Sequence, residues 1–109
     1  MHAMAEFYVY VIGLDKKVLN NKKFLERNPN YVEGKPCVYV GQSARPPEER
    51  YAQHRGGYKA NRFARDFGRY LQPRLFEGIN PLSSREEAEA EEEALALRLQ
   101  KRGYAVWWG

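Results

Sequence analysis

The sequence is poor in cysteine and has no long hydrophobic run. It contains one cysteine, Cys37, among 109 residues, so neither an internal disulfide nor a zinc site built from several cysteines can form within the chain. The longest apolar run, 7–14, is far too short to cross a bilayer. The N-terminus also lacks the basic region and long apolar region of a secretory signal. We therefore expect a cytoplasmic protein that does not use a membrane as a partner.

Repeats and low-complexity tracts are missing as well. The apolar share of 43% is ordinary for a folded protein, so wholesale disorder is not expected. A chain of 109 residues fits one domain, 1–109, and leaves no room for two domains of ordinary size.

Charge is distributed unevenly along the chain, although the net charge is only +4. Residues 45–74 carry eight arginines and lysines against three acidic residues, whereas residues 86–93 hold six glutamates. The basic lobe could dock a polyanion such as nucleic acid. The alternative interpretation is that both runs are solvated helical faces.

Two short apolar segments predict neighbouring strands. Residues 7–12, FYVYVI, are β-branched and aromatic, and Gly13 is expected to end this strand; residues 37–41 form the second strand. The polar connection between them, about 15–36, contains several breakers and is interpreted as a long insertion. A connection without a long helix favours an antiparallel pair. We predict a third strand over 73–77, PRLFE.

Three helices are expected after the second strand, which together with the strands predicts an α+β fold. Pro46 and Pro47 begin the first helix, which runs to about Arg55, because proline is tolerated in a first helical turn. The second covers about 59–67 and has one apolar face and one basic face. Ser84 begins the last helix with a capping box. The buried stripe of that helix contains Ala88, Leu95 and Leu99.

Five polar side chains occupy positions from which they could converge. Tyr10 belongs to the first strand and Tyr39 to the second. Arg50 and His54 are one helical turn apart and so share a helix face. Glu92 falls on the apolar stripe of the last helix, and an inward carboxylate is costly unless it meets a cation, a metal or strong donors. Taken singly, each of these residues has an ordinary structural explanation.

The order of these residues resembles that of the GIY-YIG nuclease domain. Val9–Tyr10 within YVYVI corresponds to the first family motif, and Tyr39–Val40–Gly41 corresponds to the second. Arg50 follows in the next helix, and the last helix carries a Glu-Ala-x-x-x-Glu pattern that ends at Glu92. The resemblance spans about 7–99. It implies a small three-stranded antiparallel sheet flanked by helices.

The resemblance further implies a metal-dependent hydrolase of phosphodiester bonds. Glu92 would ligate Mg²⁺ or Mn²⁺, and one carboxylate suffices because Mg²⁺ keeps several waters and binds substrate phosphate. Arg50 would stabilise charge that develops on the phosphate. Tyr10 would help to deprotonate the attacking water, and Tyr39 would position that water or a phosphate oxygen. His54 would orient Arg50 or contribute to proton transfer.

Nucleic acid is the partner implied, with DNA favoured over RNA, and a homodimer is left open. Gly41 would let backbone and substrate approach closely. The other expected contacts read phosphates more than bases, and they are Arg45, Arg55, Lys59, Arg62 and Arg65.

Two departures from the family pattern keep other functions open. The family usually places an asparagine after the glutamate helix, whereas this chain has none after Asn80. The connection from Tyr10 to Tyr39 is also much longer than the short hairpin of the family. One alternative is a nucleic-acid-binding module of the same fold without catalysis. The other is a small protein-interaction domain that uses the 15–36 connection and the acidic helix.

Overall fold

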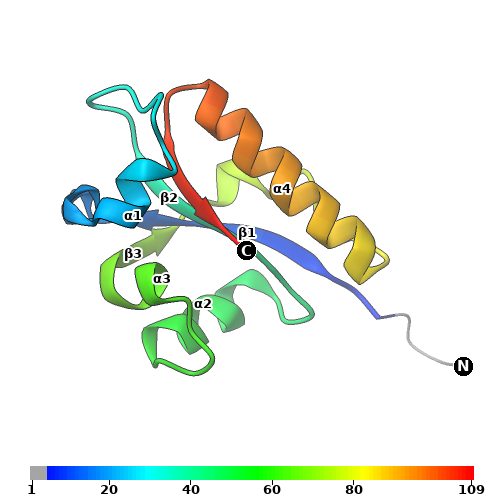
Figure 1. Ribbon diagram of the computed structural model, residues 1–109. Helices are drawn as coiled ribbons and strands as arrows, with labels where there is room; N and C mark the ends of the chain where they lie inside the picture. The colour runs from blue at the N-terminus through cyan, green and yellow to red at the C-terminus, as the bar shows by residue number, and fades with distance from the viewer. Residues whose placement is uncertain (1–4) are drawn as a thin grey trace, which may run out of the picture.

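A four-stranded mixed sheet forms the centre of the molecule, and helices lie on both of its faces (Figure 1). The structure is a computed structural model that describes residues 5–109. The spatial order of the strands is β3-β1-β2-β4. Their bounds are Tyr8–Leu14 for β1, Cys37–Ser43 for β2, Gly68–Leu71 for β3 and Ala105–Trp108 for β4. The α+β class predicted from the sequence is confirmed.

The two central strands pair in the predicted antiparallel direction. Tyr10 lies opposite Gly41, and Ile12 lies opposite Tyr39. Because opposed residues share a face and side chains alternate along each strand, Tyr10 and Tyr39 are on the same face of the sheet. The opposite face is lined by valines that are fully buried, namely Val9, Val11, Val38, Val40 and Val106.

Helices of different length cover the two faces. Helix α4 (Arg85–Lys101) runs along one side, and α1 (Lys22–Glu26), α2 (Pro47–Arg55) and α3 (Arg62–Phe67) lie on the other (Figure 1). The predicted cap of α4 is confirmed, because the Ser84 hydroxyl accepts a hydrogen bond from the backbone N–H of Glu87 at 3.1 Å. Within residues 5–109, no helix is both long enough and apolar enough to cross a membrane.

The expected third strand over 73–77 is wrong. Residues Pro73–Leu75 form a short 3₁₀ helix, η2, and the strand β3 lies earlier in the chain. Pro73 has no N–H to give to a sheet ladder. Gly68 follows α3 directly, and a Cβ at this position would run into the carbonyl of Ala64. A glycine here therefore lets the chain leave the helix at once and pair with β1.

The expected purely antiparallel, three-stranded sheet is wrong as well. The aromatic segment near the end of the described chain adds β4 as a parallel neighbour of β2. Parallel neighbours require a long crossover, and the segment that includes α4 supplies it. Gly13 does not end the first strand either, since β1 continues to Leu14. The missing side chain at Gly13 leaves room for the side chains of Gln72 and Tyr70.

The 15–36 insertion is packed against the sheet. It contains a 3₁₀ helix, η1 (Lys16–Asn20), and α1, whose Phe24 is fully buried against Phe63 with ring centroids 5.3 Å apart. The side chain of Asn28 accepts a bond from the N–H of Val106 at 2.7 Å and donates to its carbonyl at 3.1 Å. The Asn28 amide thus takes the place of a neighbouring strand, so the insertion helps to protect the outer edge of β4.

Candidate active site

Tyr10, Tyr39 and His54 form a buried cluster on the α2 side of the sheet. The Tyr10 hydroxyl lies 2.8 Å from His54 Nε2, and the three ring centroids are 5.5–6.2 Å apart. None of the three side chains is more than 6% exposed. Three of the five residues expected to converge are therefore in direct contact, two of them from neighbouring strands and one from α2.

The hydrogen bonds of His54 fix its tautomer. The backbone N–H of Asn61 donates to His54 Nδ1 at 3.2 Å, so the proton of a neutral ring sits on Nε2 and is donated to the Tyr10 oxygen. Burial and the charge of Arg50 lower the pKa of His54 to about 4, so the ring is neutral at physiological pH. His54 thus positions Tyr10, and it makes no hydrogen bond to Arg50 in the described residues.

Gly41 was predicted to let a substrate approach the backbone, but the structure gives it a packing role. A Cβ at this position would run into the ring and hydroxyl of Tyr10, which lie across it. Gly41 is also buried. Its missing side chain therefore makes room for the Tyr10 ring, and the space above it is not open to a substrate.

The two tyrosines are protonated at neutral pH. Burial, with a smaller effect of Tyr39, raises the pKa of Tyr10, and burial together with the charge of Glu92 raises the pKa of Tyr39 to about 12. Arg50 acts in the opposite direction on both. As folded, Tyr10 accepts a hydrogen bond from His54 Nε2 and keeps its own hydroxyl proton. It could accept a proton from water only if a nearby cation lowered its pKa.

Glu92 is a buried carboxylate on α4, the helix that covers the sheet face opposite to α2 (Figure 1). Its exposed fraction is 7%, which confirms the inward direction predicted from the apolar stripe. Its Oε1 accepts a hydrogen bond from the backbone N–H of Gly109 at 2.8 Å, and no ion pair involves it among residues 5–109. Burial raises the pKa of Glu92 to about 7 against the opposing effect of the Gly109 N–H.

Glu92 lies beside the point at which β4 ends. The pairing of β4 with β2 stops at Val40 and Trp108, and Gly109 follows. The charge of Glu92 raises the pKa of both tyrosines, so these groups are within electrostatic reach of each other. Neither Glu92 nor Arg50 makes a direct hydrogen bond to Tyr10 or Tyr39 in the described part of the chain.

Arg50 is anchored by the turn that follows α2. Its Nη1 donates to the carbonyl of Tyr58 at 3.2 Å and to Gln53 Oε1 at 3.1 Å, and its Nη2 donates to the carbonyl of Lys59 at 2.8 Å. A guanidinium has five N–H donors, so about two remain after these three contacts. Two donors are enough to hold one phosphate group in a fixed orientation.

Glu92 is the candidate ligand for a divalent cation. A buried carboxylate that lacks a cationic partner is costly, and a bound cation would offset that cost. However, residues 5–109 contain no group of three or more acidic, histidine or cysteine side chains that could hold a metal. Glu92 would therefore be the one protein carboxylate, with water and substrate oxygens completing the coordination as Mg²⁺ allows.

The basic residues predicted to contact phosphate are exposed, and two of them are already paired. Arg45 contacts Glu49 at 3.3 Å, and Arg65 contacts Asp66 at 2.8 Å. The other three, Arg55, Lys59 and Arg62, make no ion pair within residues 5–109. These three come from the end of α2, the following turn and the start of α3, so they are the more available phosphate contacts.

Sequence reasoning missed Asn61 and Gly109. Asn61 caps α3, since its Oδ1 accepts from the N–H groups of Phe63 and Ala64 at 2.8 and 3.2 Å. An asparagine before a helical segment is a recognisable cap, and using it would have moved the expected helix start from 59 to 62. Gly109 acts through its backbone N–H, which no residue type reveals.

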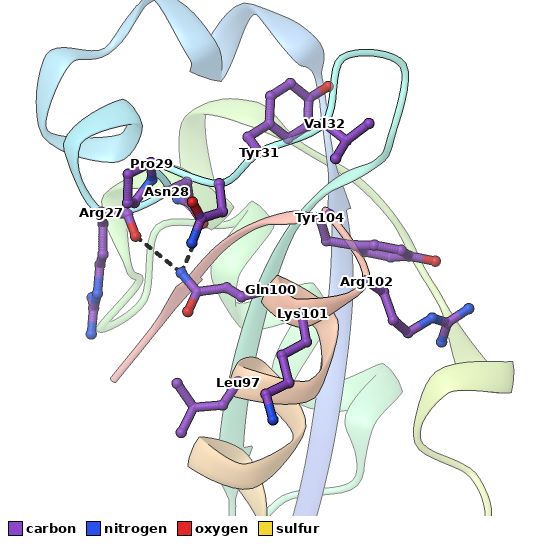
Figure 2. Close-up of a pocket in the computed structure, with 12 residues that line it drawn as sticks. Arg27, Asn28, Pro29, Tyr31, Val32, Leu97, Gln100, Lys101, Arg102 and Tyr104 are labelled. Carbon is purple, nitrogen blue, oxygen red and sulfur yellow. Dashed lines mark hydrogen bonds between the residues drawn. The ribbon is translucent and has the colours of Figure 1, made fainter.

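A hollow that involves none of these residues lies elsewhere on the molecule. It has a volume of about 720 Å³ and is bounded by the loop after α1 and the C-terminal end of α4 (Figure 2). Gln100 Nε2 bridges the two sides by donating to the carbonyl of Arg27 and to Asn28 Oδ1. None of the residues predicted for the site lines this hollow.

Comparison of the chain with protein-family models, with curated proteins and with solved structures found no match. The GIY-YIG resemblance therefore rests on the motifs in the sequence alone.

Proposed function

We propose that the chain is a divalent-metal-dependent nuclease that hydrolyses phosphodiester bonds, with DNA as the favoured substrate. The observation that carries the proposal is the buried contact of Tyr10, Tyr39 and His54, with Glu92 and Arg50 in electrostatic reach. These are the five residues that the GIY-YIG resemblance implies. A divalent cation at such a site would supply Lewis-acid stabilisation and acidify a bound water.

The residues of the chain have separate roles in this proposal. Arg50 keeps about two donors for the phosphate, where negative charge develops during hydrolysis. Tyr10 presents its O–H to a water or phosphate oxygen, and the His54 hydrogen bond holds it in that direction. Tyr39 packs against Tyr10 and His54 and supplies a second hydroxyl. Glu92 would ligate the cation.

The test is cleavage of plasmid and oligonucleotide DNA in Mg²⁺ or Mn²⁺. We expect Glu92→Gln to lower the single-turnover rate by about 10³-fold, because the cation site is worth several kcal/mol. Glu91→Gln removes the same charge one position earlier, from a partly exposed side chain, and should retain the wild-type rate. Equal rates for wild type and Glu92→Gln, or no metal-dependent cutting by the wild type, would reject the nuclease proposal.

A second candidate is a nucleic-acid-binding module without catalysis. It is favoured by the hydrogen bond from Gly109 to Glu92, which occupies one carboxylate oxygen. It is also favoured because residues 5–109 hold no group of three or more side chains that could ligate a metal. This candidate predicts salt-dependent binding of DNA without cutting. It also predicts that Glu92→Gln binds DNA as well as wild type or better, since a negative charge has been removed.

A further inference from the structure

The turn between α2 and α3 is exposed and strained. Gly57 and Lys59 both have positive φ, at 83° and 44°, and Lys59 is the only non-glycine residue with this conformation among residues 5–109. A left-handed conformation at a residue with a side chain persists only where the surroundings enforce it. Enforced strain of this kind is typical of functional sites.

Two residues of the candidate site hold the turn in place. Arg50 donates to the carbonyls of Tyr58 and Lys59 at 3.2 and 2.8 Å. His54 accepts a hydrogen bond from the N–H of Asn61 at 3.2 Å. The N–H of Tyr58 also donates to the carbonyl of Gln53 at 2.9 Å. The backbone that carries Tyr58 is therefore fixed by the same arginine that is available to a phosphate.

The side chain of Tyr58 is presented to solvent from this fixed backbone. It is 59% exposed, the highest value among the exposed large hydrophobic side chains of residues 5–109. The Lys59 ammonium lies 5.6 Å from its ring centroid, and the exposed Arg55 and Arg62 flank the turn in the chain. An exposed aromatic ring among cations is the combination that binds single-stranded nucleic acid, because bases stack on the ring while phosphates meet the cations.

We propose that Tyr58 stacks on an unpaired base next to the phosphate held by Arg50, so the substrate has single-stranded or splayed nucleotides at the cut. This inference rests on the proposed function, because it takes Arg50 as the phosphate contact. The base faces of a duplex are covered by their neighbours, so Tyr58 discriminates by strandedness and not by sequence. Its ring is positioned before binding, which lowers the conformational cost of stacking.

The test measures binding in EDTA, so that cleavage does not interfere. The probes are a fluorescein-labelled oligothymidylate of about 12 nucleotides and a hairpin duplex with the same number of phosphates. We expect Tyr58→Ala to bind the single strand about tenfold more weakly, because one stacked base is lost. Tyr58→Phe keeps an aromatic ring and should bind within about twofold of wild type. The matched control is Tyr70→Ala, since Tyr70 is 57% exposed on β3.

Two further measurements distinguish base stacking from a general loss of nucleic-acid binding. Affinity for the duplex should be the same in wild type and Tyr58→Ala, and the salt dependence of single-strand binding should not change, because no charge is removed. The inference is overturned if Tyr58→Ala binds the single strand like wild type, or if it weakens duplex binding equally. Should that happen while cleavage still depends on Glu92, the nuclease proposal survives. If the wild type binds neither probe at low salt, both proposals fail.

Discussion

The two sides of the candidate site differ in how completely the chain satisfies their polar groups. On the α2 side, both ring nitrogens of His54 are hydrogen-bonded, and its Nε2 proton goes to Tyr10. On the α4 side, the Glu92 carboxylate is buried with one N–H from Gly109 and no ion pair in residues 5–109. The first side is completed by folding alone. On the α4 side, the buried charge of Glu92 keeps a desolvation cost that a bound cation or a proton would remove. A ligand is therefore expected to bind most favourably on that side.

On the completed side, the largest loss of stability should come from His54→Ala. The substitution leaves the Tyr10 hydroxyl and the Asn61 N–H without their partner and opens a cavity beneath α2. We expect the free energy of unfolding to fall by about 4 kcal/mol, measured by urea denaturation. The control is Arg55→Ala, the next residue and an exposed one, which should change it by less than about 0.5 kcal/mol. Equal effects of the two substitutions would show that the His54 contacts do not stabilise the site.

Gly41→Ala should lower stability on the α2 side as well, because the added methyl group crowds Tyr10. The added Cβ meets the Tyr10 ring, so we expect a loss of about 3 kcal/mol in the free energy of unfolding. Gly56→Ala is the matched control, because its Cβ would have no neighbour closer than 3.5 Å. In a Tyr10→Ala background the cost of Gly41→Ala should largely disappear. Additive losses would mean that Gly41 is glycine for some other reason.

On the incomplete side, Glu92→Gln should stabilise the protein, and by an amount that depends on pH. Burial raises the pKa of folded Glu92 to about 7 from 4.5. The contribution of this group to stability is therefore fully present below pH 4.5 and is lost as the pH rises through 7. At pH 8 we expect the free energy of unfolding of Glu92→Gln to exceed that of wild type by roughly 3 kcal/mol. At pH 4 we expect little gain; both values are measured by urea denaturation in EDTA. A gain that is the same at both pH values would contradict a buried, uncompensated carboxylate.

Local periodicity accounts for the parts of the site that could be predicted from the sequence. The apolar stripe of α4 predicted the inward direction of Glu92, and the capping signal at Ser84 predicted the start of that helix. These inferences need only the spacing of residues within one element. They do not depend on how the elements pack together.

Contacts between distant segments could not be predicted in the same way. The partner of His54 depends on how α2 is rotated against the sheet, and the spacing of His54 from Arg50 suggested the wrong neighbour. The parallel pairing of β4 with β2 depends on the path of α4, which the pattern of Tyr104–Trp108 does not specify. The hydrogen bond from Gly109 to Glu92 follows from that pairing. Each of these features is set by tertiary packing.

The most direct test is a crystal structure with Mn²⁺, in which anomalous scattering locates the metal. We predict a peak at about 2.1 Å from a carboxylate oxygen of Glu92, with Tyr10, Tyr39 and Arg50 facing the metal across a space that one phosphate fills. No peak at Glu92, or a strong peak only at another site, would contradict the proposal that this carboxylate is completed by a divalent cation.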